Sequence, residues 1–245
     1  MSTESTIIIR ARKALAEGTE IDVHVPDNIE SVSFSFADGT TCSSIAEWFS
    51  VIRDRGLKDI KLSVPEKEIE RHPFGAAYEH TDIVCLWENG KASRFVRSEK
   101  WKDGKGAIEF KDIHFDGEYK ELISVENNTE EYKQVLLELK ALAEKIKYEH
   151  FARAFDTAYR VLDGTATPNH DNAPYYIKDL PDDLKDIMLA RNISYVFGGM
   201  GSWNDDPRGV SEEMGLGDEY ERLTNALIMN MRKSLFYVTN TCFLN

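Results

Sequence analysis

The spacing of apolar residues changes near residue 128, and this change constrains the fold more than any other feature of the sequence. Before that point apolar and polar residues alternate, as in strands with one buried face. After it, apolar residues recur every three or four positions, as in amphipathic helices. Strands followed by helices predict an α+β fold. We therefore expect a β-rich region with at least one helix over residues 1–127 and a helical region over 128–245, which a long helix can join in one shared core.

Alternation in the first region predicts a mainly antiparallel sheet. The expected strands are 21–25, 31–36, 59–64, 82–88, 91–97, 107–115 and 119–125. Asn89-Gly90 supplies the two positive-φ positions of a type I′ turn. The apolar residues of 107–115 share one face only if a bulge or a slip intervenes. Ser44, with Glu47 three residues later, has capping-box spacing at the start of a helix that ends near Gly56.

The second region predicts three helices. Asn128 with Glu131 can cap a helix whose apolar stripe continues to Leu162, roughly 50 Å if unbroken. Such a helix either forms a spine with a bend, which we favour, or breaks near 148–150. A shorter helix is expected from Pro181 and a final one from Asp218. The apolar tail that follows the final helix is expected to dock on the protein.

Acidic residues outnumber Lys and Arg by 43 to 30, which gives a net charge of −13. A field of this sign repels phosphate backbones and anionic membranes, so direct binding to nucleic acid or to a membrane is not expected. The sequence shows no export signal and no apolar run of membrane-spanning length. The sequence has three cysteines, an odd number scattered along the chain. This pattern is typical of reduced, buried thiols and not of a disulfide framework. We therefore expect a cytoplasmic protein.

The most distinctive segment is Tyr195–Pro207, YVFGGMGSWNDDP, in which three glycines lie close together. Its spacing fits neither a Walker loop nor the dinucleotide fingerprint, which would need a glycine at Asn204. Two interpretations remain. The glycines either allow positive φ and close backbone approach beneath an aromatic residue, or form a rigid loop that presents Trp203 and the following acids to a partner.

The run VFGGMGSWND in this segment, with a helical pattern before it and a Tyr-containing helix after it, resembles a C-terminal signature of uncharacterised bacterial proteins. Some of those proteins are associated with toxin–immunity loci. The resemblance covers residues 175–235 and leaves out the β-rich half. It implies a function of the immunity or inhibitor type, and it implies no catalytic residue.

Metal-binding patterns are weak. His72 and His80 lack the spacing of a helical zinc pair. The paired acids do not form the ordered loop that calcium requires. These pairs are Asp182-Asp183, Asp205-Asp206 and Glu212-Glu213. We therefore expect neither a metal ion nor another cofactor.

Catalytic patterns are also weak, but they leave one alternative open. His170-Asp171 is in principle a general base with an orienting carboxylate. Cys42 lies just before a helix start, where the helix dipole favours a thiolate, but no histidine is near it in sequence. The alternative function is an enzyme of unknown reaction that uses His170, Asp171, Asp205 and Asp206.

Negative charge is concentrated in residues 163–221, which hold 13 acidic and 4 basic residues and include the glycine-rich segment. We expect an electronegative, aromatic-bearing patch there, suited to a basic protein partner. The leading hypothesis is a non-enzymatic binder that masks a basic toxin or nucleic-acid enzyme. Its expected contact residues are Trp203, Asn204, Asp205, Asp206, Glu212 and Glu213. A third hypothesis, a structural subunit of an oligomer, places the apolar tail in a subunit contact.

Overall fold

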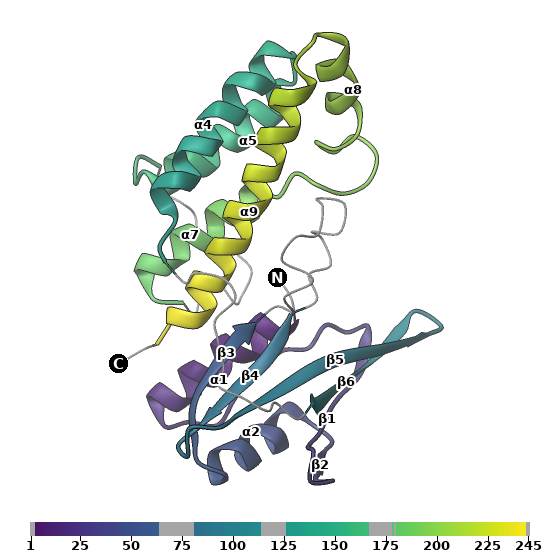
Figure 1. Cartoon of the computed structure of the whole chain (residues 1–245), viewed down its shortest axis with the longest axis vertical. Helices are drawn as coiled ribbons and strands as arrows, with labels where there is room; N and C mark the ends of the chain where they lie inside the picture. Colours follow the sequence, from purple (N-terminus) through teal and green to yellow (C-terminus); the bar gives the residue numbers. More distant parts are fainter. Residues whose placement is uncertain (1–2, 64–80, 114–125, 167–177, 179, 244–245) are drawn as a thin grey trace. The chain divides into compact units, whose positions relative to one another are not determined.

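The structure is a computed structural model that describes residues 3–63, 81–113, 126–166, 178 and 180–243. These residues form seven helices and a six-stranded sheet, and the predicted order of strands first and helices afterwards is confirmed in outline (Figure 1). They divide into two compact units. The first unit comprises the residues before 114 together with those from Thr239 onward, and the second comprises residues 126–238. The expected strand at 119–125 lies outside the described residues.

The first unit is a sheet against which two helices pack. Its helices are α1 (Thr3–Glu17) and α2 (Ile45–Asp54), and its strands are β1 (Ile29–Ser35), β2 (Thr41–Cys42), β3 (Leu57–Ser63), β4 (Asp82–Trp87), β5 (Ala92–Lys102) and β6 (Lys105–Ile113). Helix α1 packs against β3 and β4, whereas α2 packs against β1, β2 and β3. At the start of α2 the Ser44 hydroxyl accepts the Glu47 N–H at 3.1 Å, as the capping-box spacing predicts.

The sheet has the strand order β2-β1-β6-β5-β4-β3. Strand β1 pairs with β6 in parallel, which sets Val32 beside Ile108 and Phe34 beside Phe110. Strands β4, β5 and β6 pair antiparallel. The sheet is therefore mixed, and the expectation of a mainly antiparallel sheet is wrong. The local sequence does not indicate that β1 pairs with the distant β6, because alternation within a strand does not specify the direction of the neighbouring strand.

Aromatic rings fill the core of the first unit. Phe34 stacks on Trp48 with ring centroids 4.4 Å apart and on Phe110 at 5.0 Å. Phe95 meets both Phe34 and Trp48 edge to face. All four side chains are buried. Since such ring pairs add about 0.5–1.5 kcal/mol each beyond the area they bury, α2 is held firmly on the sheet.

The first 26 residues differ from their prediction. Residues 20–26 contain no strand, and α1 was not expected. Its apolar residues Ile7, Ile8 and Ile9 are consecutive, and all three are buried. A consecutive apolar run shows neither the period of a strand nor that of an amphipathic helix, so periodicity did not reveal this helix.

The β4–β5 hairpin is confirmed, but its turn is of another type. Only Gly90 has a positive φ, of 79°. Its N–H donates to the Trp87 carbonyl at 3.0 Å, and the Trp87 N–H donates to the Lys91 carbonyl at 2.9 Å. These bonds describe a type I turn followed by a glycine bulge, in which Asn89 needs no positive φ.

The type I′ turn occurs instead between β5 and β6. Asp103 has a φ of 52° and Gly104 a φ of 78°, the two positive values that this turn requires. From this turn β6 pairs with β5 without a register shift as far as Ile113. Ile113 lies on the exposed face of the strand, so the bulge expected in 107–115 is absent from the described part of that segment.

The second unit is helical. Its helices are α4 (Thr129–Lys145), α5 (Glu149–Leu162), α7 (Asp182–Ile193), α8 (Asp206–Glu213) and α9 (Gly217–Thr241), of which α9 continues beyond Val238 into residues of the first unit. One cluster of buried side chains from α4, α5, α7 and α9 forms its core. The helices expected from Pro181 and Asp218 are confirmed, whereas α8 was not expected.

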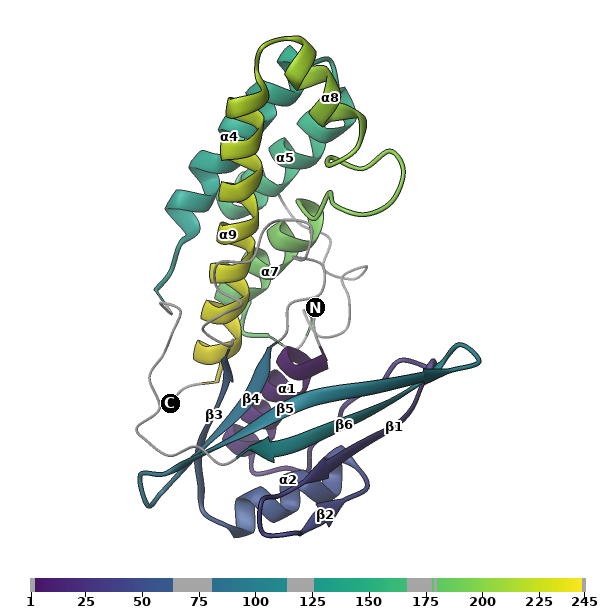
Figure 2. The same ribbon diagram turned by 45° about the vertical axis from the view of Figure 1, so that its right-hand side comes forward.

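The predicted long helix breaks into α4 and α5. Lys147 interrupts it with a φ of 65°, and the two helices then run antiparallel, side by side (Figures 1 and 2). Lys133 pairs with Asp163 at 3.3 Å and Lys140 with Asp156 at 2.8 Å across the pair. The bent spine is therefore wrong, and the alternative of a break is confirmed. The apolar stripe keeps its period through the turn, so the sequence does not mark the reversal.

Asn128 is the N-cap residue of α4, as expected, but its side chain does not make the capping bond. The Asn127 side-chain oxygen accepts the Thr129 N–H at 2.9 Å, whereas Asn128 makes no capping bond. The buried Asn128 amide instead donates to Asn230 Oδ1 of α9 at 2.8 Å and accepts from the Ser234 hydroxyl at 3.1 Å. This polar network fixes the register of α4 against α9, because a buried amide must find partners.

The apolar tail forms the end of α9. Leu235, Phe236 and Val238 are buried, so they offer no apolar surface for the subunit contact of the oligomer hypothesis. Within the first unit, Asn240 accepts the Leu62 N–H at 2.7 Å and donates to the Leu62 carbonyl at 3.1 Å. It thereby occupies part of the outer edge of β3. No helix among the described residues is long and apolar enough to cross a membrane.

Buried Arg12 of α1 joins the same part of the first unit. Its Nε donates to the Cys242 carbonyl at 2.7 Å. Its guanidinium also donates to Asp59 Oδ1 at 2.6 Å and to the Ile60 carbonyl at 3.0 Å. Three segments distant in sequence therefore meet at one side chain, and its buried charge is paired.

Candidate functional site

Trp203 has no exposed surface. Its ring meets Phe151 and Phe155 of α5 edge to face, with centroids 5.3 and 5.2 Å away, and lies against Tyr220 of α9 at 5.2 Å. Its indole N–H donates to the Thr224 hydroxyl at 2.9 Å. The expectation that Trp203 offers its ring to a partner is therefore wrong. Burial of the indole among three aromatic rings stabilises the fold more than leaving it in solvent would.

The buried indole holds a closed loop, residues 196–205, which we call the Gly–Trp loop. The backbone N–H of Trp203 donates to the Val196 carbonyl at 2.9 Å, and this bond closes the loop. The Tyr220 hydroxyl donates to the Trp203 carbonyl at 2.7 Å. Gly198 and Gly201 have positive φ, of 155° and 81°, so this part of the structural interpretation is confirmed. The expected close approach is not found, because a Cβ added at Gly198, Gly199 or Gly201 would meet no atom within 4 Å.

Side chains at the end of the loop bond to its backbone. Asn204 Oδ1 accepts the Gly198 N–H at 3.3 Å and the Ser202 hydroxyl at 2.9 Å. Asp205 Oδ2 accepts the Gly201 N–H at 2.8 Å. Gly201 has a φ of 81°, which disfavours any side chain there. Asn204 and Asp205 thus fix the loop, a role that the sequence did not distinguish from partner binding.

Met200 stands out from this fixed loop. Its side chain is fully exposed, at 101% of the reference area. Tyr195 and Phe197, just before it, are partly exposed and touch edge to face at 5.9 Å. Met200 was not singled out from the sequence, although its position among glycines, outside any periodic apolar pattern, was a usable signal. An exposed apolar side chain that packs on nothing contributes little to the fold. Single exposed apolar residues are common, so Met200 is of interest because partly exposed Tyr195 and Phe197 precede it in the same loop region.

The predicted acids lie at the two ends of α8, close to the Gly–Trp loop (Figure 1). Asp205 and Asp206 are at its start, and Glu212 and Glu213 are at its end, roughly 10 Å along the helix. All four are exposed. The structure therefore brings the four expected acids onto one short helix, and the helix replaces the loop that the sequence suggested.

Positive charge near these acids is sparse. Arg208 pairs with Glu212 at 3.4 Å and with Glu221 at 3.0 Å. Asp206 and Glu213 have no ion pair within the part of the chain that the structure describes. Burial raises the pKa of Tyr148, at the α4–α5 turn, and the charges of Asp206 and Asp205 raise it further. The negative field of α8 therefore extends to that turn.

The structure describes only part of the residues of the enzyme alternative, Asp205 and Asp206. His170 and Asp171 lie outside the described residues, as do His72 and His80. Cys42 is buried, and burial together with the charge of Glu47 raises the pKa of its thiol, which is the opposite of activation.

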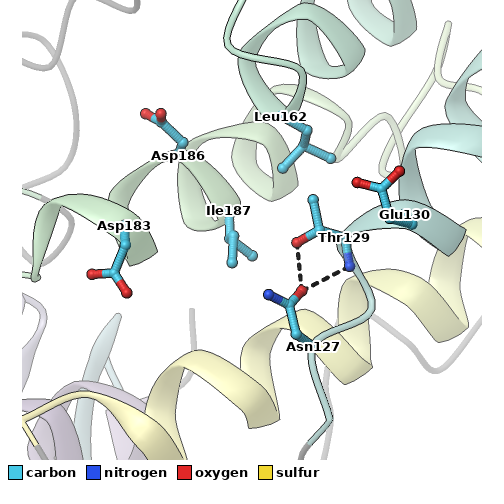
Figure 3. A pocket seen from close by; sticks show the side chains of 7 residues that line it. All are labelled: Asn127, Thr129, Glu130, Leu162, Asp183, Asp186 and Ile187. Carbon is cyan, nitrogen blue, oxygen red and sulfur yellow. Dashed lines mark hydrogen bonds between the residues drawn. The ribbon is translucent and has the colours of Figure 1, made fainter.

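A pocket of about 360 Å³ lies elsewhere in the second unit, between α4, α5 and α7 (Figure 3). It is lined by Asn127, Thr129, Glu130, Leu162, Asp183, Asp186 and Ile187. No residue expected to bind a partner lines it. Among the residues described, no three His, Cys, Asp or Glu side chains are placed to hold a metal ion.

No family model matches the chain, and neither a curated protein nor a solved structure is significantly similar to it.

Proposed function

We propose that the chain is a cytoplasmic, non-enzymatic protein that binds a basic protein through the Gly–Trp loop and α8. The observation that carries this proposal is Met200, whose fully exposed side chain stands on a loop that the Trp203 backbone N–H closes and the buried Trp203 indole anchors. Exposed carboxylates of α8 lie close to it in the chain. An apolar contact next to unpaired negative charge is the combination that a basic partner surface complements.

Both parts of this surface have a physical role in binding. Clustered carboxylates raise the rate of encounter with a positively charged partner. A loop already held by Trp203, Asn204 and Asp205 loses little conformational entropy when it binds, so more of the contact energy appears as affinity. A toxin or a nucleic-acid enzyme fits this description, because enzymes that act on polyanions carry basic surfaces.

The resemblance stated above supports the same proposal. The run VFGGMGSWND coincides with the Gly–Trp loop, residues 196–205. We therefore propose that the relation to toxin–immunity loci extends to function, and that the chain masks its basic partner as an immunity or inhibitor protein does.

Replacement of Met200 separates binding from folding. Because its side chain packs on nothing, Met200→Ala should leave the free energy of unfolding within about 0.5 kcal/mol of wild type. It should, however, weaken retention of a basic protein from native cell lysate, measured by affinity capture and mass spectrometry. Met229→Ala, at a partly exposed site on α9, is the control and should retain the partner.

Charge reversal tests the acids. Replacement of Asp205, Asp206, Glu212 and Glu213 by Lys should abolish capture, and high salt should weaken capture by wild type. Reversal of four other exposed acids in the same unit provides the matched control. These are Glu130, Glu149, Asp182 and Asp183. Capture of the same proteins by both quadruple variants would contradict the proposal.

A further inference from the structure

Strand β5 extends well past its neighbour β4. It pairs with β4 only over Ala92–Phe95, and beyond Phe95 it continues to Lys102 paired with β6 (Figures 1 and 2). No strand among the described residues pairs with the other edge of this extension. Within the described residues, the N–H and C=O groups that point to this edge thus have no strand partner.

An exposed tryptophan lies on this extension. Trp101 keeps 52% of its surface in contact with solvent, although it is one of the largest apolar side chains in the first unit. Its ring lies close to Gly106 of β6, where an added Cβ would be 3.1 Å from Trp101 Cη2. Gly106 thus leaves room for the ring, which is held in place with much of its area exposed.

Unpaired positive charge flanks the tryptophan. Lys100 and Lys102 are exposed and have no carboxylate partner within the described ranges. Glu99 is paired with Arg97 at 2.6 Å. Asp103 follows Lys102 in the turn, but residues 97–105 still hold four basic and two acidic residues. In a chain of net charge −13, this strand edge is a local exception.

We propose that the outer edge of β5 over Ser98–Lys102 binds an extended acidic segment of a partner protein as an added β-strand. Backbone bonds to the open edge would supply affinity, and side chains on alternate faces would supply specificity. Lys100 and Lys102 lie on one face of the strand and Trp101 on the other. The segment that fits carries carboxylates at alternate positions and apolar residues between them.

Lysines on an edge strand also have a protective role, since they discourage unwanted pairing. Protection from unwanted pairing does not explain Trp101, because an exposed indole favours contact with other chains. Single-stranded nucleic acid would also use an aromatic ring with lysines. The net charge of −13 and the presence of only two unpaired lysines at this edge favour the acidic peptide.

A labelled peptide of alternating Glu and Val, titrated into the full chain and followed by fluorescence anisotropy, tests this proposal. We expect saturable binding that Lys100→Glu with Lys102→Glu weakens by about ten-fold or more. Lys58→Glu with Lys91→Glu gives the same net charge at two exposed lysines away from this edge, and should bind nearly as wild type does. N-methylation of alternate peptide amides should abolish binding, which charge attraction alone would not require.

Hydrogen exchange supplies a second readout that does not depend on the lysine variants. Bound peptide should protect alternate amides between Val96 and Lys102, because the other amides already face β6. Absence of binding, equal weakening by both double variants, or preferential binding of oligothymidylate at Trp101 would each overturn the proposal. These residues are not those of the basic-partner surface, so either proposal can fail while the other stands.

Discussion

The contribution of Tyr220 to stability depends on pH, because its side chain is buried. Burial raises its pKa from 10.0 to about 12, and its hydroxyl donates to the Trp203 carbonyl. The unfolded chain therefore releases this proton near pH 10, whereas the folded chain keeps it until about pH 12. The contribution to stability is fully present below pH 10 and is lost as the pH rises through the folded-state value.

We therefore expect the stability of wild type to fall relative to that of Tyr220→Phe as the pH rises from 10 to 12. The shift of two pKa units corresponds to at most about 3 kcal/mol. Urea unfolding of both proteins at stepped pH measures this difference, and the variant serves as the control for all other titrating groups. A difference that does not change with pH would refute the assignment.

At this scale the sequence identified the important segment but not the direction of its side chains. Trp203, Asn204 and Asp205 were all expected at a partner surface, yet the first is buried and the other two bond to the loop backbone. Whether an indole faces a partner or a core depends on what lies opposite, here Phe151 and Tyr220 of two other helices. The sequence around Trp203 does not indicate which residues of other helices lie opposite it.

Asn127 and Asn128 give a matched pair of substitutions at the start of α4. Asn127→Ala removes a cap and should cost about 1 kcal/mol. Asn128→Ala removes the donor to the buried Asn230 Oδ1 and the acceptor of the buried Ser234 hydroxyl, and should cost about 2–3 kcal/mol. Chemical denaturation of both variants measures the order. A larger loss at Asn127 would mean that the cap, not the link to α9, holds α4 in place.

Elements with a complete local signal were predicted well. Helix α2 has both its cap at Ser44 and its apolar stripe, and it lies where expected. The break at Lys147 was left as one of two possibilities because nothing in the apolar period marks it. Helix α1 was missed because its isoleucines are buried all round rather than along a stripe.

At the scale of the whole molecule, Asn240 matters to a unit formed mostly by residues more than a hundred positions earlier. Its amide satisfies both backbone groups of Leu62 at the edge of β3. Asn240→Leu should therefore destabilise the first unit by about 2–3 kcal/mol. Hydrogen exchange should also show faster exchange of the Leu62 amide, while amides of α4 and α5 keep their protection. Unchanged exchange at Leu62 would contradict this role.

The order of strands followed by helices was predictable because the apolar period changes once. The parallel pairing of β1 with β6 and the return of Asn240 and Cys242 to the first unit were not. Both depend on contacts between segments far apart in the chain, for which a single sequence carries no local pattern.

The position of Asn240 also has a consequence for synthesis. A ribosome that adds about 5–20 residues per second needs roughly 6–25 s to travel from the end of β6 to Asn240. During that interval β3 exists without the amide that occupies its edge, and Arg12 exists without the Cys242 carbonyl. The first unit to be translated is thus the last to be completed, and its nascent sheet depends on the chain being made to the end of α9.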